Sequence, residues 1–278
     1  MKKQISLKKI EEFKEYLINE EKSKATVEKY IRDVISLYEF TGKKITKSEV
    51  LEYKERVLSG YAVTSANSMI AAINSFFSFL GWNELCLKRF KVQRESYCPI
   101  ERELTKEEYV RLVEAAKIKN DERLCLIIQT ICSCGIRVSE LKHITVEAVL
   151  SGEAYVECKG KIRRIFVISR LKDKLLAYAK KHNIKEGPIF ITKSGNPICR
   201  YNVWKMMKSL CKYADVDSAK VFPHNLRHLF ARTFYSNEKD IAKLADILGH
   251  SSVNTTRVYV ATSCSEHRKK MENMHLVL

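Results

Sequence analysis

Apolar side chains recur every three or four positions through the first ninety or so residues of this 278-residue chain. Such spacing places them along one face of a helix, with the polar positions between them facing water. Thr26 is expected to cap the second helix, and Gly42 and Gly60 fall where helices stop. The pattern predicts a compact bundle of four helices, with the stripes Leu7-Ile10-Phe13-Leu17, Val27-Tyr30-Ile31-Val34-Leu37, Val50-Tyr53-Val57 and Ile70-Ile73-Phe76-Phe77-Leu80.

The periodicity disappears between Leu87 and Glu103, where the basic run 88–94 leads to Pro99. We therefore expect a helical domain over 1–87, a basic linker over 88–103 and a second domain over 104–278. The linker is either a solvated connection or a segment that lies along nucleic-acid phosphates, and composition leaves both open.

The second domain is predicted to be mainly helical with a small antiparallel sheet. Thr105 and Glu108 form a capping-box pattern that starts a helix, and Gly135 ends the helix expected over 121–132. Alternating residues predict strands at 144–146, 154–158 and 163–168, with Lys159-Gly160-Lys161 as a basic turn between the last two. Further helices are expected at 172–181, 201–214, 225–235, 240–248 and after 265.

Composition limits the partner of the protein. Fifty Lys and Arg against 33 Asp and Glu give a net charge of +17, which favours a polyanion and salt-dependent binding. No apolar run approaches the roughly 18 residues of a membrane span, and the N-terminus has no signal-peptide pattern. A soluble, cytoplasmic protein with no membrane partner is expected. The nine cysteines are interpreted as reduced, mostly buried thiols.

Two basic clusters could carry chemistry. His224, Arg227 and His228 fall within about one helical turn, so two of these side chains can point into the same cleft. A zinc site is the competing interpretation, but the glutamate that an HExxH motif needs is replaced by Asn225. A purely structural, core-packing role remains open for His228. Arg137 lies among apolar residues, where Glu140 could orient it, either in a cleft or in a structural ion pair.

Tyr259 lies nine residues after His250, in the sequence Leu248-Gly249-His250 followed by a serine and threonine run. A phenol has an unperturbed pKa of about 10, so a nucleophilic role requires neighbouring cations or a base. Arg137 and Arg227 could stabilise a pentacoordinate phosphorus, because guanidinium groups are permanently charged planar forks. This combination suits attack on a phosphodiester.

Taken together, the segment Gly135-Ile136-Arg137-Val138-Ser139-Glu140-Leu141, the turn Lys159-Gly160, His224-x-Leu226-Arg227-His228, and Leu248-Gly249-His250 through Thr255-Thr256 to Tyr259 resemble the tyrosine recombinase (phage integrase) family. The motifs match in order and separation from about residue 105 to 262. The resemblance implies an N-terminal SAM-like core-binding domain and an α+β catalytic domain. It implies neither a cofactor nor a metal.

By this resemblance, Tyr259 would attack the scissile phosphate and leave a 3′-phosphotyrosyl bond and a free 5′-hydroxyl. Arg137 and Arg227 would hold the non-bridging oxygens, and Lys159 would protonate the departing oxygen. His224 would take part in proton transfer with Tyr259, and His250 would donate a hydrogen bond to the phosphate. Glu140 and His228 would support the site from behind.

The sequence departs from the family's pattern at several positions. Cys158 stands where the family has glycine, and Lys161 is a second candidate for the general acid. Cys134, Leu229 and the pair Phe166-Val167 replace other usual residues, but no catalytic group is missing.

The resemblance also implies partners: double-stranded DNA with a specific core site, and a homotetramer in which the C-terminal tail docks on a neighbouring subunit. No additional arm-binding domain is expected before the four helices. A type IB topoisomerase and a binding-only protein on the same fold are the alternatives. Neither the target sequence nor the outcome, whether integration, excision, inversion or resolution at a mobile element or elsewhere, can be inferred from the sequence.

Overall fold

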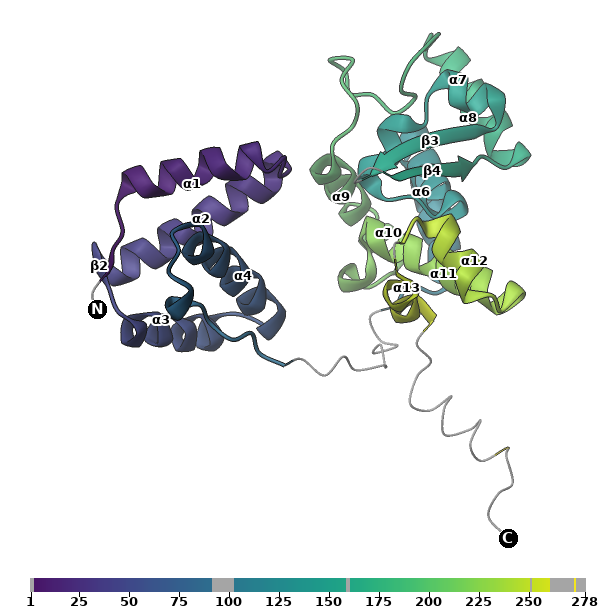
Figure 1. Ribbon diagram of the computed structural model, residues 1–278. Helices are drawn as coiled ribbons and strands as arrows, with labels where there is room; N and C mark the ends of the chain where they lie inside the picture. The colour runs from purple at the N-terminus through teal and green to yellow at the C-terminus, as the bar shows by residue number, and fades with distance from the viewer. Residues whose placement is uncertain (1–2, 92–102, 159–160, 251, 261–272, 274–278) are drawn as a thin grey trace. The chain divides into compact units, whose positions relative to one another are not determined.

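The protein folds into two compact units, Met1–Arg94 and Glu95–Leu278. The computed structural model describes residues 3–91, 103–158, 161–250, 252–260 and 273, with the backbone alone at 158, 161 and 258–260. None of the described helices is long and apolar enough to cross a membrane. Figure 1 shows the helices and strands of each unit.

The first unit contains the four predicted helices. Their apolar stripes meet in one core, in which Phe13, Phe76 and Phe77 are fully buried. Two short antiparallel strands, which periodicity does not reveal, pair beside the helices. The elements are β1 (Lys3–Gln4), α1 (Leu7–Asn19), α2 (Lys24–Thr41), β2 (Lys44–Ile45), α3 (Lys47–Gly60), α4 (Val63–Phe79) and the 3-10 helix η1 (Asn83–Leu85).

The cap of α2 differs from the prediction. Ser23, not Thr26, is the N-cap, and its hydroxyl oxygen accepts from the backbone N–H of Thr26. Both residues have a capping hydroxyl, but the helix begins one turn earlier because Lys24 and Ala25 continue it. Gly42 caps the end of α2 as predicted, with a φ of 72°.

Two asparagines of α4 hold the chain that leaves the first unit. Asn74 donates to the carbonyl of Leu87 and accepts from its N–H, both at 2.8 Å. Asn67 makes the same pair of hydrogen bonds with Phe90, at 3.0 and 2.8 Å. A side-chain amide presents a donor and an acceptor side by side, so it can satisfy both backbone groups of one residue. The chain therefore remains packed on the first unit through Phe90, beyond the predicted start of the linker.

The second unit is mainly helical with one β-hairpin. The capping box of Thr105 and Glu108 is present, and Gly135 ends α6 in the left-handed conformation, both as predicted. The elements are α5 (Lys106–Ile118), α6 (Glu122–Cys134), the 3-10 helix η3 (Val138–His143), α7 (Val146–Ser151), β3 (Glu153–Cys158), β4 (Lys161–Phe166), α8 (Ser169–Lys181), α9 (Arg200–Lys208), α10 (Cys211–Ala214), the 3-10 helix η4 (Ser218–Lys220), α11 (Pro223–Glu238), α12 (Ile241–Leu248) and α13 (Val253–Val260).

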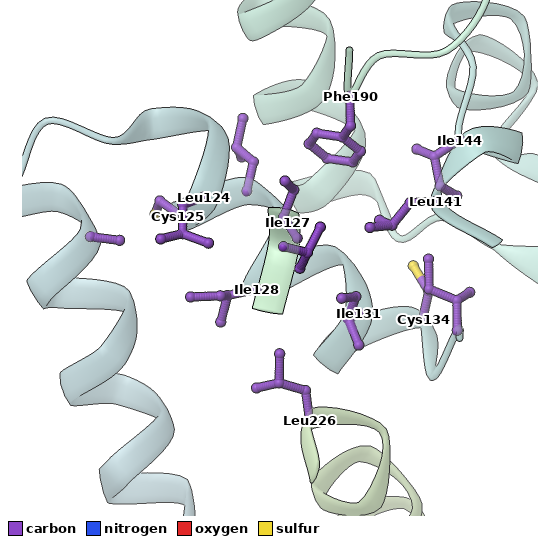
Figure 2. Packing of buried hydrophobic residues seen from close by; sticks show 14 of the residues in the cluster. Leu124, Cys125, Ile127, Ile128, Ile131, Cys134, Leu141, Ile144, Phe190 and Leu226 are labelled. Atoms are coloured by element: carbon purple, nitrogen blue, oxygen red, sulfur yellow. The ribbon is translucent and has the colours of Figure 1, made fainter. Parts of the chain in front are cut away.

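Helix α6 forms the centre of the second unit. Leu124, Ile127, Ile128 and Ile131 are nearly or fully buried and lie around more than one face of the helix. Figure 2 shows these side chains among Phe190, Leu141, Ile144 and Leu226, which come from segments far apart in the sequence. The dense packing of α6 thus fixes the place at which the following segment, which contains Arg137, leaves the helix.

The strand predicted at 144–146 is wrong. Ile144 and Val146 alternate as in a strand, but the hydroxyl of Thr145 accepts from the N–H of Ala148 and caps α7. Val146 and Val149 then share the buried side of this short helix. Pairing is limited to a single bridge between Thr145 and Pro188.

The other two predicted strands form the antiparallel hairpin β3–β4. Ala154 and Val156 are buried on β3, and Arg163 and Ile165 are buried on β4. Tyr155, Ile162 and Phe166 point to the exposed face. Lys159 and Gly160 of the predicted turn lie outside the described residues.

The predicted helix over 201–214 is divided. The N–H of Leu210 bonds to the carbonyl of Met207, three residues back, so a tighter turn separates α9 from α10. Helix α13 was not expected, because its asparagine, threonine and valine residues are poor helix formers. The helix predicted after Ser265 lies outside the described residues.

Candidate active site

Glu140 anchors Arg137 at the end of α6. The carboxylate of Glu140 is 5% exposed and accepts from the guanidinium of Arg137 at 2.9 Å and from its backbone N–H at 2.7 Å. Arg137 itself is about one-third exposed at its side chain. Glu140 therefore contacts Arg137 at both the guanidinium and the backbone, and the Arg137 side chain remains partly exposed.

A second arginine, which the sequence analysis missed, shares the same carboxylate. Arg163 of β4 is 8% exposed and donates to Glu140 at 2.5 Å and to the carbonyl of Ile247 at 2.9 Å. It lies two residues before the inward-facing Ile165, in the same register as Ile165 and Val167. A charged residue in the inward register of a strand was the signal that could have identified it.

Arg227 is fully buried on α11, although it is a charged residue. Its guanidinium donates to the carbonyls of Gly135 and Leu248, each at 2.7 Å, and to Nε2 of His250 at 2.9 Å. These three partners carry no negative charge at neutral pH. A guanidinium held in this way can form charge-assisted hydrogen bonds to an anionic ligand.

His250 lies between Arg227 and helix α13. Since Nε2 accepts from Arg227, the ring proton is on Nδ1, which lies 2.8 Å from the hydroxyl of Thr256. Burial and then Arg227, Arg137, Arg163 and His224 lower the pKa of His250 to about 4. The imidazole is therefore neutral at physiological pH.

His224 and His228 lie one turn apart on α11, with ring centroids 4.7 Å apart in an edge-to-face arrangement. The surrounding protein partly desolvates the His224 ring although the residue is exposed, and this lowers its pKa. The charges of Arg227, Arg137 and Arg200 lower the pKa further. Burial and the neighbouring His224 lower the pKa of His228 to about 4. Among the described residues, no group of three or more His, Cys, Asp or Glu is placed to hold a metal.

Two predicted catalytic residues are placed only partly or not at all. Lys159 lies outside the described residues, and of Lys161 only the backbone, paired with Cys158, is described. The backbone of Tyr259 belongs to α13 and follows the fully buried Thr256 by three residues. Three residues rise about 4.5 Å along a helix, so the backbone of Tyr259 is one turn away from the residue that contacts His250.

The cysteines beside the site are not activated. Burial raises the pKa of Cys132 to about 12 and that of Cys134 to about 11. Both thiols are protonated at neutral pH and act as small apolar groups. The six cysteines whose side chains the structure describes are all free, and three of them are buried.

The site thus combines three elements of chemistry. Arg137 and Arg227 provide positive charge, and His224 and His250 provide neutral imidazoles. Glu140 and Arg163 fix the orientation of the first arginine. A phosphate held by two arginines beside neutral histidines can be stabilised as its charge increases in a transition state.

The sequence of the chain is similar to that of known proteins over both units. The model of the phage integrase family matches residues 102–266, and that of the phage integrase N-terminal SAM-like domain matches residues 10–84. Tyrosine recombinase XerA of Pyrococcus horikoshii is 28% identical, over 96% of this chain and 94% of the relative. Tyrosine recombinase XerD of Halalkalibacterium halodurans is also 28% identical, over 91% and 92%.

Solved structures share the fold. A crystal structure of XerA recombinase is 26% identical and covers 98% of this chain and 99% of that chain, with a TM-score of 0.55. A λ integrase dimer bound to a COC′ core site is 18% identical and covers 92% and 77%, with a TM-score of 0.72. At 18% identity, the likeness to λ integrase shows a shared fold alone.

Proposed function

This chain belongs to the phage integrase family, and from that premise we propose that it is a site-specific DNA recombinase acting through Tyr259. Strands of double-stranded DNA are cut and rejoined through a 3′-phosphotyrosyl intermediate. The observation that supports this most strongly is the site itself, in which a buried Arg227, the anchored Arg137 and His250 come together. The full-length similarity to tyrosine recombinases has the same implication.

In the proposed step, the phenolic oxygen of Tyr259 bonds to the scissile phosphorus as the bond to the 5′-oxygen breaks. The phenolic proton passes to a base, and the 5′-oxygen takes a proton from a lysine. The energy of the broken phosphodiester is kept in the phosphotyrosyl bond. A 5′-hydroxyl from a partner duplex can therefore reverse the step without ATP.

Arg137 and Arg227 hold the two non-bridging oxygens in this proposal. Arg227 is preorganised by backbone carbonyls and Arg137 by Glu140, so neither guanidinium has to be ordered as the charge develops. His224 is suited to receive the phenolic proton because its lowered pKa leaves it neutral at pH 7.

His250 is proposed to donate to the phosphate from Nε2. That requires the ring proton to move from Nδ1 to Nε2, so that the Nη2 hydrogen of Arg227 that faced His250 goes to the phosphate while the bond of Nη2 to Leu248 stays in place. Thr256 tolerates either tautomer, since a hydroxyl both donates and accepts. The histidine is thus held in place throughout the change.

The general acid is proposed to be Lys159, with Lys161 as the alternative. A substrate with sulfur in place of the bridging 5′-oxygen distinguishes them, because a thiolate departs without protonation. Alanine at the true general acid should slow cleavage of normal DNA strongly and cleavage of the sulfur substrate only slightly. Equal loss on both substrates for both variants would contradict an acid role for either lysine.

The nucleophile is tested with Tyr259→Phe on a nicked duplex that carries the target site, which traps the covalent adduct. The variant should bind DNA as the native protein does and form no adduct on a denaturing gel. An adduct that persists in this variant would refute Tyr259 as the nucleophile. The target site itself is identified first by selecting bound duplexes from a random pool.

The type IB topoisomerase alternative is not favoured, because the relatives and structural neighbours named above are recombinases. A monomer that relaxes any supercoiled plasmid would support it instead. A binding-only protein is also disfavoured, since each catalytic residue type of the family is present in the chain.

A homotetramer on DNA, with the tail after Met271 docked on the neighbouring subunit, is proposed by analogy. A λ integrase tetramer bound to a Holliday junction is among the structures that share this fold, with a TM-score of 0.71. Truncation after Met271 should weaken assembly of paired sites while single-duplex binding remains. Full recombination by the truncated protein would refute the tail exchange.

A further inference from the structure

Arg163 connects three segments of the catalytic unit from a buried position. Its Nη2 donates to Glu140, which holds Arg137, and its Nη1 donates to the carbonyl of Ile247 at the end of α12. The residue itself belongs to β4, the strand that leaves the predicted turn containing Lys159. One guanidinium therefore links strand β4 to the segments that carry Arg137 and His250.

The link to the His250 segment is also steric. Gly249 has a φ of 66°, and a Cβ at this position would lie 2.4 Å from Cδ of Arg163. Only glycine permits such a close approach. The arginine side chain thus packs on the backbone directly before His250, in addition to its hydrogen bond to Ile247.

Arg163 also changes the electrostatics of Arg137. The carboxylate of Glu140 is shared by two guanidinium groups, one on each oxygen, and the N–H of Arg137 completes its partners. If Arg163 were absent, Glu140 would neutralise Arg137 alone. Because Arg163 balances this carboxylate, Arg137 retains positive charge for a phosphate.

We propose that Arg163 is a positioning residue for strand cleavage, which holds Arg137, the segment before His250 and strand β4 in one arrangement through Glu140, Ile247 and Gly249. The inference rests on the proposed function and assigns a role to a residue outside the family's usual catalytic set. Arg163 touches no substrate atom in this role. It acts through the residues that do.

The test compares Arg163→Met with Arg164→Met in the full-length protein. Arg164 is the next residue on β4, but it faces the exposed side and pairs there with Glu153 at 3.2 Å. At saturating nicked duplex, Arg163→Met should slow adduct formation on the order of 10²-fold, because small displacements of catalytic groups have effects of that size. Its DNA affinity should stay close to that of the native protein, and Arg164→Met should cleave at nearly the native rate.

A pH titration separates positioning from a merely structural ion pair. His250 is faced by Arg227 and His224 from α11, by Arg137 before η3 and by Arg163 from β4, and these groups lower its pKa after burial itself. Removing Arg163 removes one of these cations, so the pKa of His250 should rise. An NMR titration of the His250 ring should then have its midpoint at higher pH in Arg163→Met, whereas a loss of folding stability alone would leave the midpoint in place.

A second variant protects the test from a failure to fold. In Arg163→Met, Glu140 has one fewer cation beside it and carries excess negative charge. The double variant Arg163→Met/Glu140→Gln removes that charge and is measured together with both single variants. If Arg163 acts through Glu140, the double variant should cleave no more slowly than the slower single variant. Multiplying losses would overturn the inference, as would a native cleavage rate and a native His250 midpoint in folded Arg163→Met.

The native protein distinguishes the two proposals. If it forms no adduct on its selected target, the proposed function fails and Arg163 loses its role with it. If the native protein and Arg163→Met form the adduct equally fast, only the positioning role fails.

Discussion

Arg227 is fully buried, yet its identified hydrogen bonds lead to backbone carbonyls and an imidazole instead of a carboxylate. Burying a charge in this way opposes folding, because water solvates a guanidinium better than carbonyls do. Glu140, in contrast, compensates Arg137 and Arg163. Backbone carbonyls and one carboxylate thus fix the guanidinium groups of Arg227 and Arg137 in the site where a phosphate is proposed to bind.

The half-buried histidines His228 and His250 predict how stability depends on pH. The pKa of His228 is lowered to about 4 in the folded protein, whereas an unfolded histidine has a pKa of about 6.5. Between these values the unfolded chain binds a proton that the folded protein does not. The free energy of unfolding should therefore fall as the pH drops from about 6.5 to about 4. Above pH 6.5 the contribution of the neutral His228 to stability is complete.

Urea unfolding across this pH range tests the contribution of His228. His228→Gln should reduce the loss of stability between pH 6.5 and 4.5, while its curve runs parallel to that of the native protein between pH 7.5 and 8.5. An unchanged slope in the variant would show that His228 does not titrate as described. His250 should contribute in the same direction, because its pKa is also lowered to about 4.

Single elements were predicted best where the signal was local. The capping box of Thr105 and Glu108 and the end of α6 at Gly135 depend on residues within a few positions, and both are confirmed. The segment 144–146 was misjudged because alternation over three residues is compatible with a strand and with a capped helix start. Helix α13 was missed because its formation depends on packing against α11 and α12 more than on intrinsic propensity.

The end of α6 gives a prediction at the scale of the element. Gly135 has a φ of 61°, and an added Cβ would lie 2.4 and 2.5 Å from two ring atoms of Phe230. Gly135→Ala should destabilise the protein by about 2–4 kcal/mol, from left-handed strain and from overpacking. It should also slow cleavage, since the carbonyl of Gly135 holds Arg227.

Gly152→Ala is the matched control for this change. Gly152 ends α7 with a φ of 81°, but a Cβ there would meet nothing within 4 Å. Gly152→Ala should lower the free energy of unfolding by about 1 kcal/mol, through backbone strain alone. Equal unfolding midpoints for the two variants would contradict the proposed contact with Phe230.

At the scale of the whole molecule, the net charge of +17 should govern affinity for DNA. Neutralising 6–10 phosphates releases bound counterions, so affinity should fall by about 10³–10⁵ between 50 and 200 mM salt. Fluorescence anisotropy with Tyr259→Phe measures this without covalent trapping. A binding constant that barely changes with salt would argue against a phosphate-dominated interface.

The sequence by itself determined the helical periods, the excess of positive charge and the family's motifs, because each depends on residue type and spacing alone. Only the tertiary structure decided that Arg163 and Glu140 share a bond across 23 residues and that Arg227 reaches the carbonyl of Gly135 across 92. Such contacts depend on how α6, β4, α11 and α12 pack, and packing is a property of the assembled core. The chemistry could therefore be inferred before the fold was known, whereas the residues that position it could not.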